Sequence, residues 1–139
     1  YMLIMRASDE ALTASSDIPF DEIIAQMGAY NESMMNAGVM VGGDGLAPAA
    51  GVVVDFDQTP PVVTDGPYGE TKELFNGFWM IEVPTIEEAA EWARRAPLGP
   101  GNKLEIRRVT GPEDFPADNE WIQKEDQWRE ELARKAEQG

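Results

Sequence analysis

The sequence contains neither cysteine nor histidine. Without cysteine the chain has no disulfide, no thiol nucleophile and no thiolate metal ligand. Without histidine it lacks the side chain that serves most often as a general base and as a metal ligand. We therefore predict no metal site and no cofactor, and a carboxylate is the candidate for any general base.

Basic residues are scarce as well. Lysine and arginine together number 11 against 26 aspartates and glutamates, which gives a net charge of −15. Such a surface repels phosphate groups, so we expect no binding to nucleic acid or to anionic membranes. No apolar run reaches the ~18 residues of a membrane span. No signal-peptide pattern is visible either, and we expect a cytoplasmic protein.

Hydrophobic patterning predicts alternating strands and helices in the first half of the chain. Residues 1–5 are apolar and indicate a buried strand. A helix is predicted to begin between Asp17 and Asp21 and to end at Gly38. Its apolar residues are spaced three and four apart, as one helix face requires: Phe20, Ile23, Ile24, Met27, Tyr30 and Met34. A strand over 39–41 runs into a glycine-rich turn at 42–46, and strands follow over 51–56 and 61–64.

The second half repeats the order of strand, helix and strand. Strands are predicted over 78–83 and 104–109, with a helix between them that begins at the capping-box pattern of Thr85 and Glu88. We assign residues 1–110 to a ferredoxin-like α+β domain, with an antiparallel sheet and helices on one face. The other face is left bare, which favours a homodimer.

Residues 111–139 are predicted to form a linker and a charged helix that begins near Asp118. Trp121, Trp128 and Leu132 give this helix a narrow apolar stripe. We predict that this stripe packs on the rest of the chain or on a partner subunit. The alternative is that it recruits another protein.

A loop over residues 65–73 reads Asp-Gly-Pro-Tyr-Gly-Glu-Thr-Lys-Glu. Asp-Gly-Pro is a turn signal, but the loop gathers more ionisable groups than a turn needs. Its candidate ligand-binding residues are Asp65, Tyr68, Glu70 and Lys72, and Asp65 is also a candidate general base. The alternatives are a turn cap for Asp65 and a solvated loop for the others. We expect residues 65–76 to be ordered, with Asp65 accepting hydrogen bonds from backbone amides of the loop.

Strand alternation adds candidates on the last strand. Leu104 and Ile106 should face the helices, which leaves Glu105 and Arg107 on the opposite face. Glu105 is a candidate general base and Arg107 a candidate ligand contact. The alternative is an ion pair between strands or between subunits. Breaking a buried pair by Arg107→Ala would cost about 3 kcal/mol.

The same alternation places Phe78, Met80 and Glu82 on the opposite face, so Glu82 is a further ligand-binding candidate. Arg6 shares a face with Met2 and Ile4, although the pattern does not say which face. If the opposite face lines a dimer, its charges must pair with each other or with a ligand, because unpaired buried charges cost several kcal/mol.

The loop with Gly77 and the strand behind it resembles the signature of the DGPF branch of the YCII-related family. Further matches are residues 37–39 (Ala-Gly-Val), 43–46 (Gly-Asp-Gly-Leu), 82–83 (Glu-Val), 88–89 (Glu-Ala), 91–93 (Glu-Trp-Ala), Pro97 and 105–107 (Glu-Ile-Arg). Tyr68 stands where the motif has phenylalanine, and Gly69 stands where it usually has alanine. The resemblance implies a ferredoxin-like fold that dimerises into an α+β barrel.

The resemblance also bears on function. Some relatives are suspected enzymes with a His–Asp pair, and this role cannot be carried over to a chain without histidine. DGPF members are often encoded beside extracytoplasmic-function sigma factors, which implies an accessory role in signalling. One hypothesis is therefore an accessory or small-molecule-binding homodimer that takes a small anionic ligand or a protein partner. The alternative is a small lyase, isomerase or hydrolase. Its base would be Asp65 or Glu105, with Arg107 or Lys72 holding an anionic substrate.

Overall fold

The computed structural model describes residues 1–8, 17–47, 51–65 and 73–138. Within it the chain forms two compact units, Tyr1–Arg108 and Val109–Gly139. The predicted loop contacts Tyr68, Glu70 and Lys72 lie outside the described residues, and so does the side chain of Asp65. The predicted order of the loop and the predicted acceptor role of Asp65 are therefore untested.

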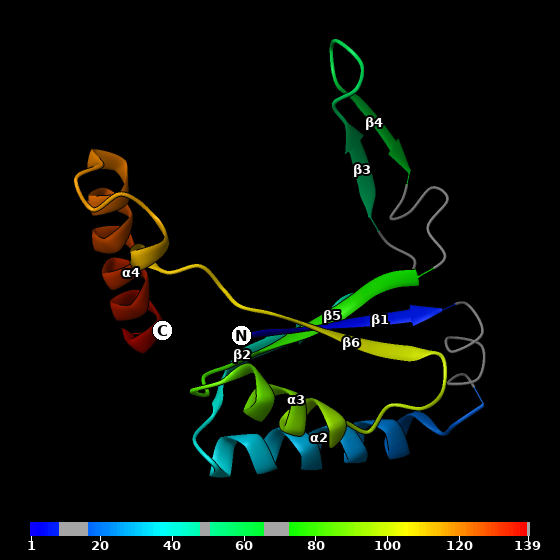
Figure 1. The fold of residues 1–139 in the computed structure, drawn as a ribbon. Helices are drawn as coiled ribbons and strands as arrows, with labels where there is room; N and C mark the ends of the chain where they lie inside the picture. Colours follow the sequence, from blue (N-terminus) through cyan, green and yellow to red (C-terminus); the bar gives the residue numbers. More distant parts are fainter. Residues whose placement is uncertain (9–16, 48–50, 66–72, 139) are drawn as a thin grey trace. The chain divides into compact units, whose positions relative to one another are not determined.

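A four-stranded antiparallel sheet forms the centre of the first unit (Figure 1). Its strands are β1 (Met2–Ser8), β2 (Met40–Gly45), β5 (Glu73–Ile81) and β6 (Asn102–Arg107). They lie in the order β2-β5-β1-β6, so β1 and β5 are central and β2 and β6 are edges. Together with the two helices that connect its strands, this order gives the ferredoxin-like α+β arrangement that the sequence predicts.

Helices α2 (Phe20–Asn36) and α3 (Ile86–Arg94) lie on the same face of the sheet (Figure 1). α2 ends as predicted, because Gly38 adopts a φ of 73° that only glycine accepts readily. At the start of α3 the amide of Glu88 donates to the Thr85 hydroxyl oxygen over 3.2 Å. This contact confirms the predicted N-cap.

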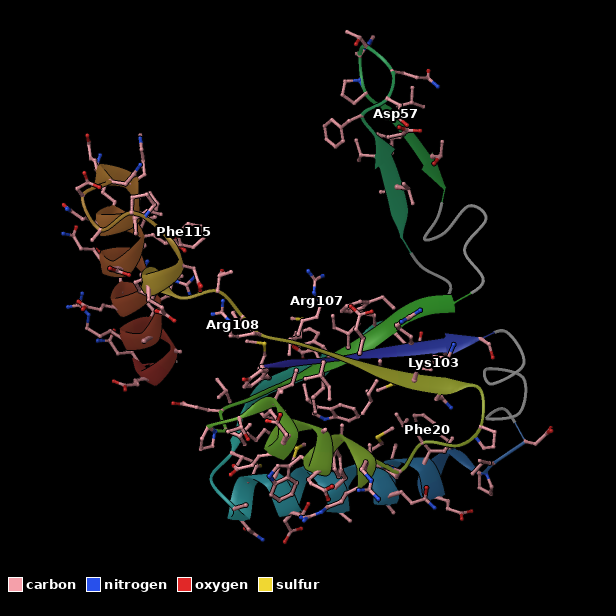
Figure 2. All side chains as sticks on the ribbon, viewed as in Figure 1. Phe20, Asp57, Lys103, Arg107, Arg108 and Phe115 are labelled. Atoms are coloured by element: carbon pink, nitrogen blue, oxygen red, sulfur yellow. The ribbon has the colours of Figure 1, made fainter. Side chains whose placement is uncertain are left out.

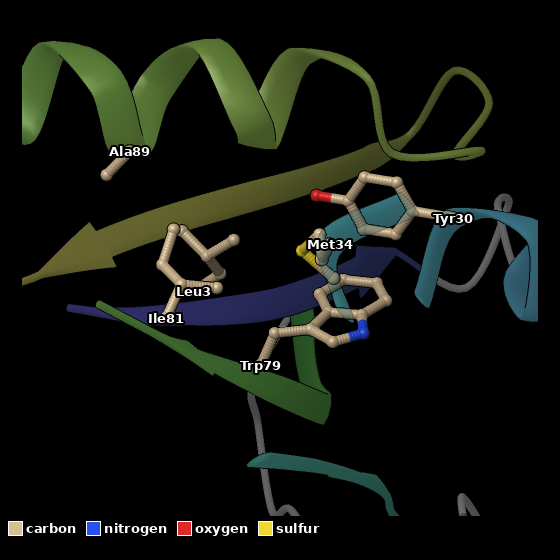
Figure 3. Packing of buried hydrophobic residues seen from close by; sticks show 6 residues of the cluster. All are labelled: Leu3, Tyr30, Met34, Trp79, Ile81 and Ala89. Carbon is tan, nitrogen blue, oxygen red and sulfur yellow. The ribbon is translucent and has the colours of Figure 1, made fainter. Parts of the chain in front are cut away.

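The core lies between this helix layer and the sheet. Figure 3 shows its buried members, which are Leu3, Tyr30, Met34, Trp79, Ile81 and Ala89. The ring of Tyr30 meets that of Trp79 edge to face, with centroids 5.2 Å apart. The Tyr30 hydroxyl donates to the carbonyl oxygen of Trp92 over 2.7 Å, which ties α2 to α3. Burial raises the pKa of Tyr30 to about 12, because the phenolate would lose its solvation.

The glycine-rich turn predicted at 42–46 is wrong, because residues 42–45 belong to edge strand β2. Gly43 pairs with Trp79, and a Cβ at this position would lie 2.7 Å from the carbonyl oxygen of Phe78. The glycine therefore permits close packing of two strands. From the sequence alone, the same run of glycines indicates a turn. β5 also begins at Glu73, earlier than the predicted start at residue 78, and ends at Ile81.

The strands predicted over 51–56 and 61–64 are confirmed as β3 (Val52–Asp55) and β4 (Val62–Asp65). They pair with each other in a separate two-stranded antiparallel sheet. Register places Val52, Val54 and Val63 on one face of this hairpin, and all three are exposed.

The second unit contains a short 3-10 helix, η1 (Pro112–Asp114), and α4 (Glu120–Gln138). The Asn119 side chain accepts from the amide of Trp121 over 2.9 Å and so begins α4 close to the predicted position. Two ion pairs join side chains four residues apart on α4. Lys124 lies 3.0 Å from Glu120, and Arg129 lies 2.8 Å from Glu125. The predicted stripe of Trp121, Trp128 and Leu132 is exposed.

Candidate functional site

The sheet face opposite α2 and α3 carries the charged candidates, and we call it the opposite face. Strand pairing arranges its side chains in three rows across the sheet. The first row contains Gly42, Met80, Met2 and Arg107; the second contains Asp44, Phe78, Ile4 and Glu105; the third contains Phe75, Arg6 and Lys103. The central strands thus supply mainly apolar side chains, while edge strand β6 supplies a column of charged ones.

Three of these charged groups form a small cluster. Arg6 Nη1 lies 3.2 Å from Glu105 Oε1, and Arg107 Nε lies 4.0 Å from Glu105 Oε2. The side chains of Arg6 and Glu105 are each 40% exposed, whereas that of Arg107 is 72% exposed. Glu105 thus forms its ion pair mainly with Arg6. The contact with Arg107 is at the distance limit of an ion pair, and most of the Arg107 side chain is in solvent. Figure 2 shows Arg107 on the side of the sheet away from the helices.

The predicted facing of the last strand is confirmed. Leu104 and Ile106 pack against the core, and Glu105 and Arg107 lie on the opposite face. The structure also decides the face of Arg6, which the sequence left open, because Leu3 is fully buried on the helix side. The partner of Glu105 in this single chain is therefore Arg6 more than Arg107.

Two other candidates are not brought into this cluster. Glu82 follows the end of β5, is exposed, and borders a separate depression with Gly38, Val83 and Pro84. Its backbone amide donates to the Val39 carbonyl oxygen over 2.8 Å, and no described residue forms an ion pair with its carboxylate. Asp65 ends β4 in the separate two-stranded sheet.

Sequence reasoning missed Lys103, which pairs with Arg6 across β1 and β6. The signal was present, because Lys103, Glu105 and Arg107 alternate at every second position. Starting the predicted strand at Leu104 placed Lys103 outside it, and β6 in fact begins at Asn102.

The described part of the chain gives no buried charged side chain and no group of three acidic residues arranged as metal ligands. A carboxylate general base needs burial to raise its pKa toward neutrality. The catalytic roles of Asp65 and Glu105 therefore remain predictions. No helix among the described residues has the length and apolarity needed to cross a membrane.

Comparison with known proteins identifies the family. The model of the YCII-related domain matches residues 1–116. Over 89 residues the chain is 29% identical to an uncharacterised protein of Rhizobium meliloti (strain 1021), an alignment that covers 63% of this chain and 72% of that protein. Since all four strands of the main sheet and both helices that cover it fall within the matched segment, the chain belongs to the YCII-related family.

Proposed function

We propose that this protein is a homodimer that binds a small anionic molecule and that its two chains meet through the opposite face of the sheet. The observation that carries the proposal is the arrangement of that face, in which an apolar centre is bordered by the cations of β6. In a chain of net charge −15, a face that sets Arg6, Lys103 and Arg107 against Glu105 and Asp44 is unusual because its cations outnumber its carboxylates.

The apolar centre supports the dimer. Met2, Ile4, Phe78 and Met80 are only half-buried, and α2 and α3 both lie on the other face. A second copy related by twofold symmetry would cover these side chains with their equivalents. An interface of this kind buries about 2,000 Å² or more in total.

The surroundings of Arg107 support the proposal that a small anion binds at this face. Its nearest described carboxylate is 4.0 Å away and is already held by Arg6 at 3.2 Å. Covering the face with a partner would remove water from Arg107 without supplying a full counter-charge from its own chain. A carboxylate or phosphate that accepts hydrogen bonds from the planar guanidinium would compensate this cost.

We assign the protein to the cytoplasm and to the DGPF branch, with residues 1–110 as the dimerising domain and residues 111–139 as an accessory segment. The resemblance to proteins encoded beside extracytoplasmic-function sigma factors gives a second part to the proposal, an accessory role in signalling. Co-purification with such a sigma factor tests this part. It should depend on the exposed stripe of Trp121, Trp128 and Leu132, so Trp128→Ala should weaken it.

The main test combines oligomeric state with ligand response. Sedimentation at micromolar concentration should give the mass of a dimer. In a thermal-shift screen with acetate, succinate, citrate and inorganic phosphate, at least one of these anions should raise the melting temperature. Arg107→Ala should abolish that stabilisation. The control is Arg94→Ala, because Arg94 is equally exposed and pairs with Glu91 at 2.7 Å on α3. A monomer mass refutes the dimer, and an anion response that survives Arg107→Ala refutes the site.

A further inference from the structure

A cavity lies on the helix side of the sheet, between α2 and the strands β1, β2 and β5. Its volume is about 370 Å³, within the range of small-molecule sites. The described residues that line it are Met5, Met27, Asn31, Met40, Gly43, Asp44, Gly45, Phe78 and Trp79. None of the cations of the anionic site proposed above, Arg6, Lys103 and Arg107, lines this cavity, although Asp44 and Phe78 of the opposite face also contribute to its lining.

The walls of this cavity are mainly apolar and adaptable. Three methionines come from three different elements, Met5 from β1, Met27 from α2 and Met40 from β2. Methionine is unbranched and polarizable, so such a wall adjusts to the shape of a ligand. On the β2 side, Gly43 and Gly45 contribute no side chain, which keeps the space beside Trp79 open.

One polar group with a defined orientation lines the cavity. The indole Nε1 of Trp79 donates to Asn31 Oδ1 over 2.8 Å. Since an indole nitrogen only donates, the oxygen of the Asn31 amide must face the tryptophan. The Nδ2 group of Asn31 is thereby fixed on the other side of the amide, and no described residue accepts a hydrogen bond from it.

Charge selects the class of ligand. No described basic side chain lines the cavity, Asp44 borders it, and the chain carries a net charge of −15. An anion would therefore enter against repulsion and without a counter-ion. We propose that this cavity binds an uncharged, mainly apolar small molecule whose carbonyl or ether oxygen accepts a hydrogen bond from Asn31 Nδ2.

Methionine methyl resonances provide a direct test, because the seven methionines of the chain report on different places. Met5, Met27 and Met40 line the cavity, whereas Met2 and Met80 lie on the opposite face. Acetophenone is a suitable neutral probe, with benzoate as its anionic counterpart and ethylbenzene as the analogue without an acceptor. Acetophenone should shift the three cavity methionines saturably and leave the other two in place. Benzoate should not shift the cavity set.

Asn31→Asp isolates the hydrogen bond. The aspartate keeps an oxygen for the Trp79 indole but removes the Nδ2 donor, so it should weaken acetophenone binding about tenfold while ethylbenzene binding changes less. Near-ultraviolet circular dichroism checks that Trp79 remains packed. If that check fails, Met27→Trp supplies a second variant, because the larger side chain should fill the cavity and prevent binding.

Three results would overturn the proposal: shifts confined to Met2 and Met80, equal affinity of wild type and Asn31→Asp, or no saturable shift up to the solubility limit of acetophenone.

Discussion

Arg107→Ala should have different effects on the single chain and on the dimer. In the single chain the Arg107 side chain is 72% exposed and lies 4.0 Å from Glu105. Such a solvated pair contributes from zero to about 1 kcal/mol. If a partner covers the opposite face, Arg107 loses its water and the bound anion compensates its charge, so at saturating anion the removal of Arg107 costs the dimer about 3 kcal/mol. That cost corresponds to a roughly 150-fold rise in the dimer dissociation constant.

Sedimentation over a dilution series, with the stabilising anion from the thermal-shift screen at saturation, would measure this constant for wild type and variant. Urea unfolding below the dissociation constant would measure the stability of the single chain. Arg107→Ala should weaken the dimer by the large factor and change the single chain little. Arg94→Ala is the matched control, since its ion pair is shorter, at 2.7 Å, while its side chain is exposed on α3, away from the proposed interface. Equal and small effects of both variants on the dimer would refute the placement of Arg107 in an interface.

Three further predictions concern the fold that positions both sites. Gly43→Ala should lower the free energy of unfolding by about 1–3 kcal/mol, because the new Cβ would lie 2.7 Å from a carbonyl oxygen; Gly45→Ala, which has open space, should not. Stability should fall as pH rises from about 10 to 12, since unfolded tyrosine ionises there while Tyr30 stays protonated; Tyr30→Phe should flatten that slope in urea titrations. Thr85→Ala should cost about 1 kcal/mol by removing an N-cap, and Thr85→Ser should restore it; an unchanged melting temperature in Thr85→Ala would contradict this.

Much of this fold could be predicted because its signals are local. The start of α3 follows from Thr85 and Glu88, three residues apart, and the end of α2 follows from the single residue Gly38. The facing of Glu105 and Arg107 follows from the two-residue period of a strand, once its neighbours are seen to be apolar. Each of these inferences needs only a few consecutive residues, so sequence alone was sufficient.

The sites depend on contacts between distant residues, and only the tertiary structure decides these. Arg6 meets Glu105 across 99 positions, and Asn31 meets Trp79 across 48. The first contact is set by strand order and register, and the second by the packing of α2 on β5; local patterning encodes neither. The same holds for Gly43, where a glycine-rich sequence indicates a turn but close pairing with Trp79 makes it part of a strand. Sequence therefore determined which elements form. The register of β1 between β5 and β6 determined which charges meet, and the packing of α2 on the sheet determined which residues line the cavity.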